Sequence, residues 1–266
     1  MVFSSTGCDG LSGAGAGLRP VLVALAAAGT LVLGACGDPA GPSASDVLSE
    51  TTSTTHFEFH YSPGDAVDAP RQEAYHDWVL PYLDVAVSRK LQYFKYRDRA
   101  HLHRVTRKAT NGWADPPAFA VHAIWPWDAH EAVHIYTALF GRPSDFFNEG
   151  IAVALSYDPL GGRFVSLWNN QAIHDIASNL LRTRALPSIP SIAEADTFRR
   201  QNDQVAYPVA GSFVSFVLDQ RGVPAMKAFF GASSQDDRLG VIESRFSASF
   251  GWSLAEAEAR WHEFLQ

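Results

Sequence analysis

The chain has 266 residues, of which 47% are hydrophobic and 18% are charged. This composition is ordinary for a globular protein and unlike that of a disordered chain. The net charge of −7 argues against a nucleic-acid partner, because nucleic-acid binding usually needs a basic surplus.

The first 35 residues predict an export signal. A single arginine, Arg19, precedes an uncharged apolar run over residues 21–33. As a helix this run would extend about 20 Å, short of the roughly 30 Å hydrocarbon core of a membrane. A buried core helix is the alternative, but a run that is apolar on every face near an N-terminus favours a signal peptide over residues 1–35.

Leu33-Gly34-Ala35-Cys36 resembles the lipobox of bacterial lipoproteins. The resemblance implies that Cys36 is lipidated and that the protein is exported and anchored to the membrane of the bacterial cell envelope. Cys8 would be removed with the signal, which leaves no pair of cysteines for an internal disulfide. We therefore expect stability to come from the hydrophobic core alone.

Residues 36–55 are rich in Ser, Thr, Gly and Pro and predict a flexible linker after the lipidated cysteine. The remaining residues, 56–266, are enough for one domain with a sizeable core.

Alternating apolar residues predict strands at 56–61, 91–96 and 118–125, with a helix between the first two at 69–88 that breaks or kinks at Pro81. After residue 127 the helical period dominates. We predict a helix that opens at Asp128 and ends before Gly141, followed by helices near 145–156, 168–183, 207–218 and 254–265. Few strands followed by many helices indicate an α+β domain.

His130-Glu131-Ala132-Val133-His134 places two imidazoles one helical turn apart, on the same face of a helix. Two such nitrogens can reach one Zn²⁺ ion without straining the helix. Glu131 is offset by one residue, where it can hydrogen-bond a water molecule on the metal. Alone this is a moderate signal, because such patterns also arise on solvated helices.

A catalytic zinc site needs a third protein ligand. Metzincins have a histidine six residues after the second one, where this chain has Phe140. Glu149 is a better candidate, because the break at residues 141–143 lets the next helix fold back toward His134. Asp145 is the next candidate.

Asn148-Glu149-Gly150 after the histidine pair resembles the gluzincins, the thermolysin-like zinc peptidases. The gap of fourteen residues is similar to that of small peptidase MA-like proteins, as are residues 143–147 and 207–214. The resemblance implies a thermolysin-like zinc peptidase domain with a small N-terminal sheet and a mainly helical C-terminal part. It also implies that Zn²⁺ is held by three residues, His130, His134 and Glu149.

By the same resemblance, Glu131 would activate the water on zinc as general base and then act as acid, and Tyr207 would donate to the oxyanion. The expected function is hydrolysis of peptide bonds in a peptide or protein substrate. An alternative for Tyr207 is a core aromatic. Alternatives for the chain are a non-catalytic zinc-containing surface lipoprotein that binds a partner in its cleft, and a structural lipoprotein without metal. The presence of Glu131 favours the enzyme, because binding alone needs no base.

Val153 stands where relatives carry an acidic residue that braces a ligand histidine, so the residue that orients each histidine is not identified. We expect the strand at 118–125 to lie at the cleft edge and pair with an extended substrate. His122 on that strand could face the cleft, whereas the remaining histidines are interpreted as surface or packing residues. No acidic residue can be assigned to binding the free α-amino group of a substrate. The sequence therefore gives no support to an aminopeptidase.

Overall fold

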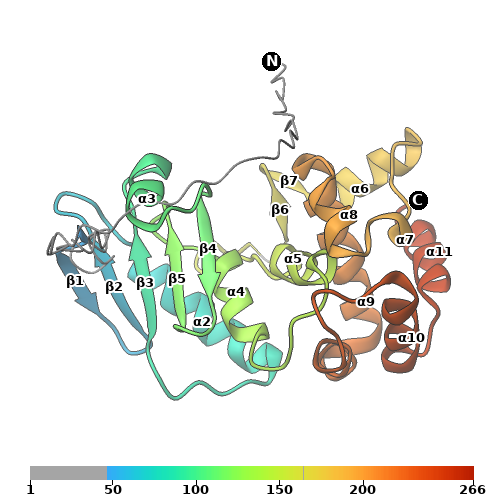
Figure 1. Ribbon diagram of the computed structural model, residues 1–266, viewed down its shortest axis with the longest axis horizontal. Helices are drawn as coiled ribbons and strands as arrows, with labels where there is room; N and C mark the ends of the chain where they lie inside the picture. The colour runs from blue at the N-terminus through green and yellow to red at the C-terminus, as the bar shows by residue number, and fades with distance from the viewer. Residues whose placement is uncertain (1–46, 164) are drawn as a thin grey trace, which may run out of the picture. The chain divides into compact units, whose positions relative to one another are not determined.

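A five-stranded mixed sheet and the helices around it occupy the first part of the described chain, and helices make up most of the second part (Figure 1). The computed structural model describes residues 47–163 and 165–266. The predicted α+β class is confirmed, with the sheet formed before residue 124. The predicted signal peptide, Cys36 and residues 37–46 of the predicted linker lie outside the described residues.

The sheet has two antiparallel edges around a parallel centre. Its strand order is β1-β2-β3-β5-β4, with β2, β3 and β5 parallel to one another. Helices α2 (Ala69–Leu83) and α3 (Arg99–Thr106) lie in the connections between the parallel strands, which need such crossovers. The strands are β1 (Glu50–Ser53), β2 (Phe57–Tyr61), β3 (Leu91–Lys95), β4 (Gly112–Asp115) and β5 (Ala120–Ala123).

The sheet differs from the prediction at both edges. Residues 50–53, assigned to the linker over 36–55, form the edge strand β1, and Leu48 just before it is buried. The strand predicted at 118–125 shortens to β5 and lies between β3 and β4, so it is not an edge. The other edge is β4, which begins at Gly112 and was not predicted.

The two faces of the sheet carry different side chains because residues alternate along each strand. Buried residues on one face, such as Phe59, Tyr93 and Val121, join the main core. The opposite face carries one ring from each of four neighbouring strands, paired in register from β2 to β4. Adjacent rings in this row are parallel to within 14°, in the order His60, Phe94, His122 and Trp113.

Eight helices and a short hairpin follow the sheet in the described chain. Helix α9 packs against α5, α6 and α10, as Figure 1 shows. None of the helices in residues 47–163 and 165–266 is long and apolar enough to cross a membrane. The elements are α4 (Ala129–Thr137), α5 (Asp145–Ala154), β6 (Leu167–Trp168), β7 (Gln171–Ala172), α6 (Ile173–Arg182), α7 (Ile189–Ile192), α8 (Ala195–Arg199), α9 (Asp203–Ala232), α10 (Leu239–Phe250) and α11 (Leu254–Phe264).

The predicted helices are present, but several boundaries differ. Helix α2 ends at Leu83, five residues early, because Asp84 adopts a left-handed conformation with φ of 50°. The helix predicted at 168–183 begins only at Ile173, after the β6–β7 hairpin. The helix predicted at 207–218 starts earlier and continues as α9, interrupted at Gly222 where φ is 78°. Helix α11 opens with a capping box formed by Ser253 and Glu256, whereas α3, α7, α8 and α10 were not predicted.

Helices α5 and α9 approach each other closely through two glycines. A Cβ atom on Gly150 would lie 2.6 Å from Cγ2 of Val214 and 2.8 Å from the carbonyl oxygen of Ala210. A Cβ atom on Gly211 of α9 would likewise overlap the side chain of Val153 on α5. The glycine after Glu149 is therefore required by helix packing, and not by a turn.

Gly150→Ala should destabilise the domain by about 1–3 kcal/mol, because the added methyl group meets the backbone of α9 and forces the two helices apart. Gly240→Ala is the matched control, since Gly240 lies in helix α10 and a Cβ atom on it would have no other atom within 4 Å. There the change should be neutral or stabilise by up to about 1 kcal/mol. Urea unfolding of both variants measures the difference, and equal stabilities would contradict this account of the helix contact.

Candidate metal centre

Helix α4 begins at a buried carboxylate that fixes its position. The side chain of Asp128 accepts a hydrogen bond from the backbone N–H of Glu131 at 3.0 Å. The backbone N–H of Asp128 donates to Oε1 of Gln72 on α2 at 2.8 Å, and Gln72 returns a bond to the Asp128 carbonyl. This pairing orients the first turn of α4, which carries His130 and Glu131.

The connection from α4 to α5 is set by close contacts to the C-terminal helices. Gly141 has φ of 151°, and a side chain on it would overlap the backbone of Phe230 at the end of α9. Ser144 occupies the N-cap position of α5 but does not cap the helix with its side chain. Its hydroxyl donates instead to the carbonyl of Ala193 at 2.6 Å. These contacts turn α5 back toward α4.

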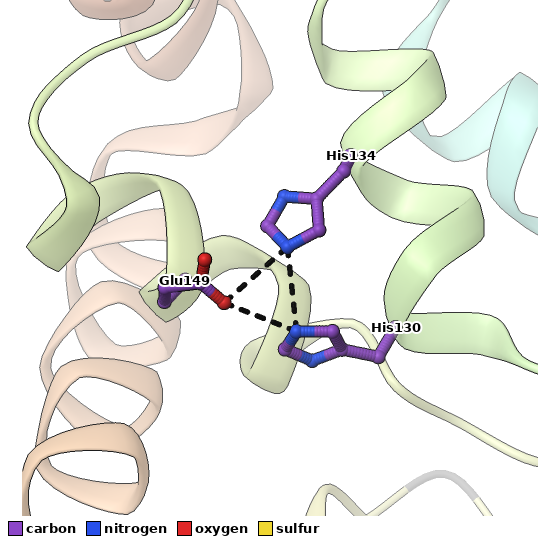
Figure 2. Close-up of side chains that lie close together, drawn as sticks. All are labelled: His130, His134 and Glu149. Carbon is purple, nitrogen blue, oxygen red and sulfur yellow. Dashed lines mark hydrogen bonds and ion pairs between the residues drawn. The ribbon is translucent and has the colours of Figure 1, made fainter. Parts of the chain in front are cut away.

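Three side chains from α4 and α5 converge on one point, as Figure 2 shows. Nε2 of His130 lies 3.1 Å from Oε2 of Glu149, and Nε2 of His134 lies 3.3 Å from the same oxygen. The two Nε2 atoms are 3.3 Å apart. Glu149 therefore joins the two histidines, as the sequence predicted, and the three residues form a group that can hold a metal ion.

The spacing of the three atoms fits tetrahedral coordination of one metal ion. Ligands at about 2.0–2.1 Å from a tetrahedral centre lie about 3.3–3.4 Å from each other. The separations of 3.1 to 3.3 Å are close to this value. The two imidazole nitrogens and the carboxylate oxygen also point their lone pairs toward one another. A cation between the three atoms would accept all of these lone pairs.

The charges of the three groups are strongly linked. Burial alone would lower the pKa of both histidines, but Glu149 outweighs it and raises the pKa of His130 and of His134. Burial would raise the pKa of Glu149, but His134 and the hydrogen bonds from both imidazoles hold that pKa far below its usual range. Glu149 is thus an anion, and a metal ion would compete with protons for the two histidines.

Glu131 lies beside this group without belonging to it. A Cβ atom on Gly112 of β4 would lie 3.1 Å from Oε1 of Glu131, so the glycine leaves space for the carboxylate. Burial raises the pKa of Glu131 well above its ordinary value, and the backbone of Ala114 on the same strand opposes that rise by hydrogen bonding. The two glutamates therefore have opposite pKa shifts, although both lie in one cleft.

Tyr207 lies on α9, with its ring 6.4 Å from the ring of His130. Burial raises the pKa of its hydroxyl, and Glu149 raises it further, so the group remains a hydrogen-bond donor at neutral pH. Trp168 of the β6–β7 hairpin stacks on Tyr207 at 5.1 Å. The indole N–H of Trp168 donates to Gln204, which lies one helical turn before Tyr207.

A cleft of about 1070 Å³ opens over these groups. Glu131, Glu149 and Tyr207 line it, together with β4, the β6–β7 hairpin and the start of α9. Sequence reasoning missed β4 and the hairpin. Asn169-Asn170 after Leu167-Trp168 is a signal for a tight hairpin, and both asparagines have positive φ.

Three residues discussed from the sequence lie elsewhere or act differently. Asp145 pairs with Arg199 and accepts a bond from Gln235, so it is not in the metal group. Val153 packs against Gly211, and the buried Nδ1 of His134 has no hydrogen-bond partner among the described residues. His122 does not face the cleft, because it is buried in the row of rings and bonded to Tyr96, with its pKa lowered by burial to about 3.

A second group, formed by His56, Glu73 and Asp77, also has ligand atoms close together. Here Nδ1 of His56 lies 2.6 Å from Glu73, whose other oxygen accepts the backbone N–H of His56. Asp77 is 3.7 Å from the imidazole and mostly exposed. Hydrogen bonds within the protein account for this cluster.

No family model, curated protein or solved structure matches the chain. The interpretation of the centre therefore rests on its own residues and their geometry.

Glu149→Gln should weaken binding of a divalent metal such as Zn²⁺ or Co²⁺ by more than about 100-fold, because it replaces the anion among the three ligands. Asp145→Asn is the matched control on the same helix and should leave metal affinity unchanged, since its carboxylate pairs with Arg199. Calorimetric titration of each variant measures the affinities. Tight stoichiometric binding by the Glu149 variant would show that the third ligand has been misassigned.

Proposed function

We propose that this chain is a zinc peptidase of the gluzincin type, with a thermolysin-like domain, exported and anchored to the bacterial cell envelope through lipid on Cys36. The observation that carries the proposal is the separation of roles around one cleft. Three ligand atoms lie at tetrahedral spacing, and a fourth group, the carboxylate of Glu131, lies beside them and outside the set.

The donor set supports zinc. Two imidazole nitrogens and one carboxylate oxygen are the ligands of catalytic zinc sites that keep one position open for substrate. When bound, Zn²⁺ supplies a Lewis acid that makes water nucleophilic near neutral pH and polarises a carbonyl group. His130, His134 and Glu149 would hold it.

Glu131 fits the role of general base. Its pKa is raised by burial, and proton transfer is most efficient when the pKa of the base lies near the working pH. It would accept the proton of the attacking water and pass it to the departing amine. Its position against Gly112 keeps the carboxylate toward the cleft, on the side where the edge strand passes.

Tyr207 fits the role of oxyanion donor. Its hydroxyl stays protonated. Its ring lies near His130 and is carried by α9, whereas the three ligands lie on α4 and α5. The stacked indole of Trp168 restricts the ring to one orientation. A donor held in place before reaction stabilises developing charge without reorganisation.

The edge strand β4 supports a peptide as substrate. One side of β4 pairs with β5, and no other strand in the described chain pairs with its second side. An extended peptide could add there as a further strand, with main-chain hydrogen bonds that do not depend on its sequence. The proposed pairing edge is therefore residues 112–115, in contrast to the strand at 118–125 that the sequence had suggested.

Glu131→Gln should abolish nearly all peptide hydrolysis while zinc content and thermal stability stay close to those of the unchanged protein, because only the proton acceptor is removed. Asp203→Asn alters another acidic residue that lines the cleft and should change the rate little. Hydrolysis of a mixed peptide library, measured beside elemental analysis of zinc, makes the comparison. Peptide cleavage at an unchanged rate by the Glu131 variant would overturn the mechanism.

Tyr207→Phe should reduce turnover by about 10²–10³-fold, as expected for loss of one oxyanion donor. The ring and its contact with Trp168 remain, so folding and zinc content should not change. Steady-state kinetics on the best library peptide, with unfolding measured in parallel, gives the result. An unchanged turnover number would show that Tyr207 is only an aromatic residue of the core.

A further inference from the structure

One short segment carries a concentration of positive charge that the overall composition does not reveal. Residues 97–108, which include helix α3, contain five Arg and Lys residues and a single acidic residue, in a chain with a net charge of −7. The five cations are Arg97, Arg99, Arg104, Arg107 and Lys108; they are called the α3 surface below.

All five cations of the α3 surface are exposed. None of them forms a salt bridge with an acid among residues 47–163 and 165–266. The single acid, Asp98, is occupied as the N-cap of α3, where its side chain accepts the backbone N–H of His101 at 2.7 Å. The pKa of His101 is lowered, first by burial and then by Arg97 and Arg104. Asp98 also interacts electrostatically with Arg104, so five exposed cations in this segment are balanced by one acid.

The underside of α3 lies next to the point where the N-terminal segment enters the domain. Leu48, Tyr96 and Leu102 form a small buried cluster that joins residue 48 directly to α3. Cys36 precedes the first described residue by eleven positions. Even fully extended, this stretch spans only about 35–40 Å. A lipid on Cys36 would thus hold the α3 surface within reach of the membrane.

We propose that the α3 surface binds anionic lipid headgroups and is a second membrane contact beside the lipid on Cys36. The proposal relies on the anchor of the proposed function for the nearness of the membrane, and it is independent of peptidase activity. Electrostatic attraction to anionic lipids adds to the membrane binding that the acyl chains of an anchor provide. Each Lys or Arg close to an anionic surface adds to the attraction within about a Debye length.

A lipid surface fits these residues better than a nucleic acid. Proteins that bind single strands combine positive charge with aromatic side chains on which bases stack. The large exposed hydrophobic residues of the described chain include none in residues 97–108. The α3 surface offers charge alone, which suits a layer of phosphate headgroups.

The test uses the chain from residue 36 onward with Cys36→Ala, so that no lipid is attached. This protein should sediment with phosphatidylcholine vesicles only when they also contain phosphatidylglycerol, and added salt should release it. Arg104→Gln, Arg107→Gln and Lys108→Gln together should weaken that binding by roughly 10- to 100-fold. The control replaces three exposed cations elsewhere, Arg163, Arg184 and Arg200, and should have little effect.

Equal losses in the two triple variants would overturn the proposal, because binding would then follow net charge and not the α3 surface. Binding to neutral vesicles alone would overturn it too, as would tighter binding to a single-stranded oligonucleotide than to anionic vesicles. Peptide hydrolysis by both triple variants in solution should equal that of the parent. Loss of vesicle binding with unchanged hydrolysis separates this proposal from the proposed enzymatic function.

Discussion

The close contact of α5 with α9 is the constraint on which the candidate centre depends. Glu149 lies on α5 and Tyr207 on α9, and their separation is set where Gly150 meets Ala210 and Val214. Any side chain at Gly150 would widen this contact and move the carboxylate relative to both α4 and Tyr207. The small residue is therefore a geometric requirement of the site, although it has no polar atom of its own to offer a substrate.

Neighbouring charges, and not residue type, distinguish the two glutamates. Both Glu131 and Glu149 lose hydration in the cleft, which favours their neutral forms. Glu149 contacts two imidazoles and stays ionised. For Glu131, burial outweighs the opposing effect of His130 and raises the pKa, and Asp128 and Glu149 raise it further. One carboxylate is thus suited to hold a cation and the other to exchange a proton.

The ligand group could be predicted because its geometry is local. Two histidines one turn apart share a helix face whatever the fold, and a short turn returns Glu149 to them. The edges of the sheet could not be predicted in the same way. Strand β1 has hardly any apolar pattern and forms through its pairing with β2. Strand β4 begins at Gly112, and the pair Asn111-Gly112 indicates a turn at least as strongly as a strand. Long-range pairing decides such segments.

The row of stacked rings has a consequence for the edge strand. Edge strands usually fray, and a ligand that pairs with one must first order it. Trp113 of β4 lies 3.8 Å from His122, parallel to within 3°, and Phe94 and His60 continue the row across the sheet. Fraying of β4 would therefore break this ring contact as well as the pairing with β5, which favours an ordered edge in the free protein. Where the edge is already ordered in the free protein, a ligand that paired with it would mainly lose its own conformational freedom.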